Sequence, residues 1–317
     1  FTCPLEPHEI ARLQQLSERV EELWKEHTAA LVRDRARTED PLAVWPAEDD
    51  PKARAISRAE KDAIRRAGLF NEDGDLATPF RRLKLVMDYW CALWFWPIAE
   101  SARLPSREEW WTEVGAILEG NIVELQPQVE LDLVQSAEPE PLLPEVQGDM
   151  FGAAQPVLAA PTSPVLHDRL GQLRISRLRK HFPRIELIES IADKYHFMHW
   201  ELFFADILLE RGGFDLVLGN PPWLKVEWNE AGILGDKNPL FAIRKFSASE
   251  LARLRKQAFV EFPGLQDAWT EELQEAEGAQ NFLNAVQNYP LLKGVQTNLY
   301  KCFIPLAWSL NSAQGVT

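Results

Sequence analysis

A short segment near the middle of the chain combines residue types that can hold a planar amine. The apolar run 214–218 leads directly into Gly219-Asn220-Pro221-Pro222-Trp223. The side-chain oxygen of Asn220 and the backbone carbonyl of Pro221 both accept hydrogen bonds, while the two prolines fix the backbone and remove N–H donors. Together the two acceptors can take both protons of an NH₂ group and orient its nitrogen lone pair toward an electrophile.

Trp223 adds a flat aromatic face on which a planar ring can stack, an interaction that contributes about 1–3 kcal/mol per nucleobase. The place of the segment also suits a ligand, since α/β folds bind ligands at the carboxyl ends of their strands. We call Asn220-Pro221-Pro222-Trp223 the tetrad and expect it to be catalytic. An ordinary turn is the alternative, because Asn favours turns and Pro-Pro ends a strand.

The tetrad resembles motif IV of the amino-methyltransferases, in which Asp, Asn or Ser precedes Pro-Pro and an aromatic residue. The preceding residues extend this resemblance. The stretch from His199-Trp200-Glu201-Leu202-Phe203-Phe204 through Gly212-Gly213-Phe214-Asp215 into the tetrad is similar to the large adenine methylases of type IIG restriction-modification enzymes and of the BREX and DISARM phage-defence systems. Looser agreement covers the Trp-rich helices before it.

The resemblance implies transfer of a methyl group from S-adenosylmethionine to adenine N6 in double-stranded DNA. The base would be flipped out of the duplex, because its amine cannot be reached in the stack. Asn220 and Pro221 would orient the amine, and Trp223 would stack on the base. Restriction or phage-defence proteins are the further partners that this resemblance implies.

The chain departs from this family at the cofactor. The family's cofactor loop has an acidic residue followed by a Gly-x-Gly turn, and this sequence contains no Gly-x-Gly. We therefore expect a fragment of a longer protein, inactive by itself, with the residues that bind S-adenosylmethionine in the rest of that protein. Loss of cofactor binding is the alternative.

Residues that flank the tetrad are candidates for substrate binding. Asp215 lies at the start of the apolar run, where a carboxylate is a cap or a structural partner as often as a substrate-binding residue. Glu227 and Trp228 follow the tetrad closely and are placed to line the mouth of a pocket or to touch DNA.

The net charge of −14 is unfavourable for a nucleic-acid-binding protein, because affinity for phosphates comes from Lys and Arg. Any contact with DNA must therefore be local. The densest basic stretch spans 174–184, and its helical spacing makes Arg174, Arg177 and Lys180 the candidates for phosphate contacts. A solvated helix surface is the alternative interpretation.

The composition is that of an ordinary globular protein, with 46% hydrophobic and 26% charged residues. Cys3, Cys91 and Cys302 lack CxxC spacing, which argues against a zinc cluster or a disulfide framework. A metal site built from Asp193, His196 and His199 is a weaker alternative, because the neighbouring aromatic residues indicate a packed helix. No signal peptide or membrane-spanning run is visible, so we expect a cytoplasmic protein without a membrane contact.

The expected fold is helix-rich α/β, with a helical region over 1–124, a Pro-rich linker or loop over 125–165 and a partial Rossmann-like methyltransferase domain over 166–317. Periodicity and capping signals predict the elements. Helices are expected over 7–37, 53–67, 79–99, from 106, 196–209, 247–260, 265–288 and 299–310, and strands over 184–189, 214–218 and from 315. The strand at 214–218 lacks enough alternation to be half exposed, so we expect it to be buried.

Two other functions share these observations. Glutamine and RNA-guanine methyltransferases also use Asn-Pro-Pro-aromatic to hold a planar amine or amide, so a protein or RNA amino-methyltransferase is one alternative. A noncatalytic interaction module of a defence complex is the other, and the missing glycine loop favours it.

Overall fold

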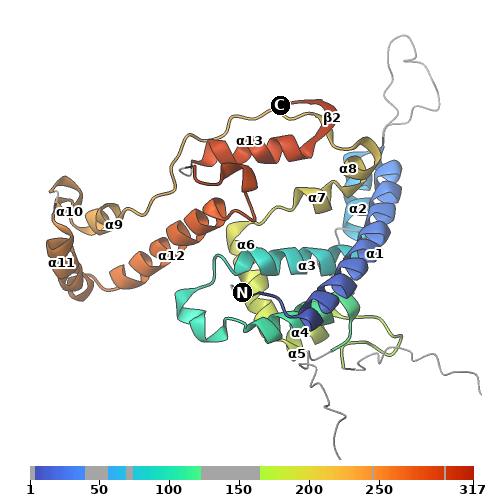
Figure 1. Ribbon diagram of the computed structural model, residues 1–317, viewed down its shortest axis with the longest axis horizontal. Coiled ribbons are helices and arrows are strands. Elements are labelled where there is room, and N and C mark those ends of the chain that lie inside the picture. The colour runs from blue at the N-terminus through green and yellow to red at the C-terminus, as the bar shows by residue number, and fades with distance from the viewer. Residues whose placement is uncertain (1–3, 40–55, 69–73, 123–164, 245, 296–297) are drawn as a thin grey trace, which may run out of the picture.

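The computed structural model describes residues 4–39, 56–68, 74–122, 165–244, 246–295 and 298–317. Almost all of the expected linker at 125–165 lies outside these ranges. The described chain is helix-rich and contains one small parallel sheet of two strands (Figure 1). At this level the expected helix-rich α/β class is confirmed.

The described elements follow one another as a run of helices that the two strands interrupt late in the chain. They are α1 (Pro7–Thr38), α2 (Arg58–Ala67), α3 (Pro79–Ala92), the 3-10 helix η1 (Ile98–Arg103), α4 (Arg107–Glu119), α5 (Ile175–His181), α6 (Arg184–Tyr195), α7 (Trp200–Phe203), α8 (Ala205–Arg211), β1 (Phe214–Leu216), α9 (Glu230–Lys237), α10 (Leu240–Ile243), α11 (Ala248–Glu261), α12 (Leu265–Asn284), the 3-10 helix η2 (Pro290–Leu292), α13 (Leu299–Leu310) and β2 (Asn311–Val316). The capping boxes expected at Ser106 and Ser247 are both present, each with the Ser hydroxyl accepting from the backbone N–H three residues later.

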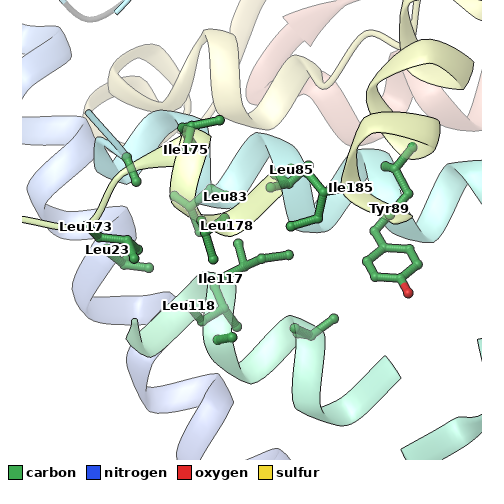
Figure 2. Close-up of a cluster of buried hydrophobic side chains, with 14 of the residues drawn as sticks. Leu23, Leu83, Leu85, Tyr89, Ile117, Leu118, Leu173, Ile175, Leu178 and Ile185 are labelled. Atoms are coloured by element: carbon green, nitrogen blue, oxygen red, sulfur yellow. The ribbon is translucent and has the colours of Figure 1, made fainter. Parts of the chain in front are cut away.

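The larger hydrophobic core lies between α1, α3, α4, α5 and α6 (Figure 2). Leu23, Ile117, Leu178 and Ile185 are fully buried there. Burying one such side chain contributes about 1.5–3 kcal/mol relative to leaving it exposed. We call this set of packed residues the first cluster. It includes residues from both sides of the segment 123–164.

The expected strand at 184–189 is wrong, because these residues begin the helix α6. Ile185, Ile188, Ile191 and Ala192 are its buried residues, so the apolar spacing is that of one helix face. The alternation of polar and apolar residues over 184–187 fits a strand, but the spacing of Ile185, Ile188, Ile191 and Ala192 fits a helix.

A second, smaller cluster lies where α9, α10 and α11 gather at one end of α12, away from α1 and α3 (Figure 1). Leu234, Phe241, Ala258 and Leu265 are its buried apolar residues. Toward its other end α12 contacts the first cluster, where Phe282 packs against Phe95 with ring centroids 6.1 Å apart. The helix α12 therefore touches both clusters.

The sheet pairs β1 with β2 in parallel, with Phe214 opposite Asn311 and Leu216 opposite Val316. A parallel pair needs a long crossover, and here the crossover includes α9 to α13. Gly213, which has a φ of 133°, lets the chain pass the partner strand closely, because a Cβ there would lie 2.4 Å from the carbonyl carbon of Asn311.

The expectation that 214–218 is a buried strand is wrong in extent and in burial. The strand ends at Leu216, which is 63% exposed, and Leu218 is 89% exposed. Within β1 the partly buried residue is Phe214, which packs against Trp200 and Phe204. With two strands among the described residues, no element covers the rest of β1. The strand expected from 315 is present but begins earlier, at Asn311.

Candidate functional site

The tetrad follows β1 in a segment without helix or strand, at the carboxyl end of a strand in a parallel pair. Asn220, Pro222 and Trp223 are exposed, and Pro221 is half-buried. The Asn220 side chain has no hydrogen-bond partner among the described residues, so its amide oxygen is available as an acceptor. None of the four residues belongs to either hydrophobic cluster of the described chain.

The C-terminal residues 299–316, which comprise α13 and β2, hold both ends of this segment, and we call them the C-terminal brace. Before the tetrad, the backbone N–H of Val217 donates to the carbonyl of Val316 over 2.9 Å. After it, the N–H of Leu299 donates to the carbonyl of Leu224 over 2.9 Å. The tetrad therefore lies between two residues, Val217 and Leu224, whose backbones are hydrogen-bonded to the C-terminal brace.

The indole of Trp223 stacks on the ring of Tyr300, with centroids 4.8 Å apart and an interplanar angle of 22°. Trp223 is nevertheless 78% exposed. One aromatic neighbour thus covers part of the indole and leaves most of it open to solvent. No pattern in the sequence points to Tyr300, because an aromatic residue in an apolar helix is usually a core residue.

The three flanking candidates are not all gathered at the tetrad. Asp215 forms an exposed ion pair with Arg211 at 2.5 Å, and Glu227 lies 3.6 Å from Lys225. Trp228 packs edge-on against Trp269 of α12, with centroids 5.4 Å apart. The side chain of Trp228 therefore belongs with the second cluster, whereas that of Trp223 is held by α13.

The candidates for phosphate contacts lie on and before α5, which packs beside α4 at the opposite end of the view from the segment that follows β1 (Figure 1). The Arg174 guanidinium binds the Asp168 carboxylate, with Nε 2.7 Å from Oδ2. Arg177 donates to the backbone carbonyl of His167. Lys180 is exposed and has no partner in the part of the chain that the structure describes. Two of the three candidates are thus engaged within the protein.

His199 is a structural residue rather than a metal ligand. Its Nε2 lies 2.7 Å from Oδ1 of Asp88, whose Oδ2 accepts from Nζ of Lys84 over 2.8 Å. His196 is exposed and ends α6 with a φ of 53°. Within the described ranges no three His, Cys, Asp or Glu side chains gather in a way that could hold a metal ion.

A polar cavity of about 190 Å³ lies beside this pair, between α3, α5 and α6. Its charged side chains largely neutralise one another. Lys84 pairs with Asp88, and Arg179 pairs with Glu189 through contacts of 2.6 and 2.9 Å. The cavity is therefore lined largely by charged side chains that are already paired, and none of its lining residues belongs to the tetrad.

The described residues do not fit S-adenosylmethionine. A cofactor of this size is held where the backbone can approach it closely, which requires glycine in the turn after a strand. The turn after β1 contains Pro221 and Pro222, and its one glycine, Gly219, is not part of a Gly-x-Gly turn. The described residues thus provide acceptors for an amine but no glycine turn that would hold the methyl donor.

Comparisons of the chain with family models, with curated proteins and with solved structures find no match. Among the helices that the structure describes, none combines the length and apolar character needed to cross a bilayer. The geometry of the tetrad is therefore the main basis for a functional proposal.

Proposed function

We propose that this chain presents the N6 amine of adenine to a methyl donor, as the target-base part of a DNA adenine-N6 methyltransferase of a restriction-modification or phage-defence system. The observation that carries the proposal is the exposed tetrad at the carboxyl end of β1, with the Asn220 amide unpartnered and Trp223 78% exposed. A cytoplasmic enzyme acting on double-stranded DNA fits this proposal.

The acceptors suit an exocyclic amine. The Asn220 side-chain oxygen and the Pro221 carbonyl would each take one proton of the NH₂ group, which leaves the nitrogen lone pair directed away from them. The indole of Trp223 would stack on the flipped base. S-adenosylmethionine would supply the methyl group, and residues outside those described here would bind it.

The finer fold that goes with this proposal is a Rossmann-like sheet of which β1 and β2 are a part. Parallel strands joined by a helical crossover are the repeating unit of such sheets. Ligands in these folds lie at the carboxyl ends of the strands, which is the position of the tetrad.

A glutamine side-chain amide of a protein substrate is the second candidate acceptor. The net charge of −14 and the internal pairing of Arg174 and Arg177 favour it over DNA. The same two acceptors suit either group, because an amide and an exocyclic amine both present a planar NH₂.

The test measures transfer of labelled methyl from S-adenosylmethionine to unmethylated DNA, RNA and protein acceptors by the protein encoded by the native reading frame that contains this chain. We expect label on adenine N6. The variant Asn220→Ala should lower kcat by about 100-fold, the cost typical of removing one positioned polar group at a reacting centre. Asn220→Asp, which keeps an acceptor oxygen, should retain more activity than Asn220→Ala.

Two results would contradict the proposal. Label on protein with none on DNA would move the glutamine alternative ahead. If a protein that binds S-adenosylmethionine labels none of the three acceptors, methyl transfer itself is rejected for this site.

A further inference from the structure

The ring of Tyr300 is the more firmly held partner in its stack with Trp223. Tyr300 is half-buried in the first turn of α13, whereas Trp223 is 78% exposed. Later in the same helix, Cys302 and Leu310 are buried, 3% and 4% exposed, so they fix α13 on the molecule. The centroid distance of 4.8 Å lies within the range in which aromatic pairs attract each other.

The backbone of the C-terminal brace sets where this ring stands relative to the tetrad. The hydrogen bond from Leu299 to Leu224 joins the residue before Tyr300 to the residue after Trp223. At the other end of the brace, β2 pairs with β1 immediately before the tetrad. Backbone contacts thus hold the chain before and after the tetrad to the C-terminal brace that carries Tyr300.

From this arrangement we infer that Tyr300 is a positioning residue, which stacks on one face of the Trp223 indole and holds the other face ready for the planar ring of the substrate. The inference rests on the proposed function. An aromatic side chain on an exposed extended segment samples several staggered rotamers unless a neighbour restricts it. Tyr300 provides that restriction, and the substrate ring completes a stack of three planar groups.

The first measurement concerns positioning and needs no substrate. Hydrogen exchange of the Leu299 backbone amide, which donates to the carbonyl of Leu224 beside Trp223, is compared in the wild-type chain and in the variants Tyr300→Ala, Tyr300→Leu and Tyr300→Phe. We expect exchange about two- to twelvefold faster in Tyr300→Ala, the range that corresponds to about 0.5–1.5 kcal/mol for an aromatic pair, and close to wild type in Tyr300→Phe, which keeps the ring. Unchanged exchange in Tyr300→Ala would show that Tyr300 does not hold this segment and would overturn the inference.

The second measurement is methyl transfer by the same variants in the full native protein. We expect Tyr300→Ala to lower kcat about five- to tenfold with a smaller change in KM, because the loss is one of orientation. Tyr300→Phe should restore the rate, whereas Tyr300→Leu, which keeps apolar volume without a flat ring, should not. A rate increase in Tyr300→Ala would mean that Tyr300 occupies the face that the substrate needs, and would overturn the inference.

The two measurements separate this inference from the proposed function. If wild-type protein with bound donor labels no acceptor, the proposed function fails, and the exchange data still decide whether Tyr300 positions Trp223. If transfer occurs and none of the Tyr300 variants changes it, the proposed function stands and the positioning role is rejected.

Discussion

Among single residues, His27 shows most directly what burial does to an ionisable group. Its side chain is fully buried, and its Nε2 lies 2.7 Å from the carbonyl oxygen of Leu202. Since a carbonyl only accepts, Nε2 carries the proton, and Nδ1 is left without a partner among the described residues. Burial lowers the pKa of the imidazole from 6.5, so a second proton has no favourable place in the folded protein.

The free energy of unfolding should therefore decrease as the pH falls below 6.5, because the unfolded chain takes up a proton that folded His27 refuses. With a lowered folded pKa, this stabilisation is present above 6.5 and is lost toward acid, by at most about 1.4 kcal/mol per pH unit. Urea unfolding at about pH 7.5 and about pH 5.5 measures the loss. The variant His27→Gln keeps a donor for Leu202 and should show a smaller difference; an equal difference would assign the effect to other groups.

The site also shows at the residue scale what a sequence can and cannot predict. The tetrad was found because its four residues are adjacent, so their chemistry is visible without a fold. Tyr300 was missed because it reaches Trp223 only through the folding of α13. Trp228 was placed near the tetrad by sequence distance, but the chain turns away at Asn229, which caps α9.

Among the elements, the pairing of β1 with β2 depends on Gly213. A Cβ at this position would lie 2.4–2.6 Å from backbone atoms of Leu310, Asn311 and Ser312, none of which can rotate away. We expect Gly213→Ala to separate the strands, with a loss of about 1–3 kcal/mol or more from the strained φ alone. Hydrogen exchange at 214–217 and 311–316 measures this loss. Gly219→Ala is the matched control, since a Cβ there meets nothing within 4 Å and should leave exchange unchanged.

Element boundaries were predicted well where local signals decide them. The Ser106 and Ser247 capping boxes fix the starts of α4 and α11, because a hydroxyl next to the four unpaired backbone N–H groups of a helix start satisfies one of them. The strand predicted over 184–189 is wrong because so short a segment suits either a strand or a helix. Tertiary packing of Ile188 and Ile191 stabilises the helix. The prediction that β1 is buried is wrong because burial depends on which elements cover a sheet, and a local sequence pattern does not contain that information.

Across the whole molecule, two hydrophobic clusters are joined through α12. Contacts that tie the middle of α12 to the first cluster are polar or very close. Lys194 pairs with Glu271 at 2.5 Å, and the N–H of Ile98 donates to Gln274 over 3.0 Å. At Gly278 a Cβ would lie 2.7 Å from the carbonyl oxygen of Trp94, so only glycine allows the helix to approach so closely. The second cluster can therefore lose its packing while these contacts persist.

The clusters should respond separately to loss of packing. Leu234→Ala removes a fully buried side chain from the second cluster and should cost about 2–5 kcal/mol, which is comparable with the whole stability of a small core. We expect faster hydrogen exchange over 230–265, with no change in α3 or α6. Ile188→Ala, an equally buried change in the first cluster, should speed exchange in α3 and α6 and leave exchange over 230–265 unchanged.

The tetrad makes this comparison informative for function, because its segment runs from β1, which contacts α8 and β2, to α9 of the second cluster. Backbone bonds from Val217 and Leu224 to the C-terminal brace lie on the β1 side of Trp228. If these bonds hold the tetrad, Leu234→Ala should leave exchange at 214–224 and methyl transfer close to wild type. Faster exchange at 214–224 in this variant would show that the tetrad depends on the second cluster, and that the brace alone does not position it.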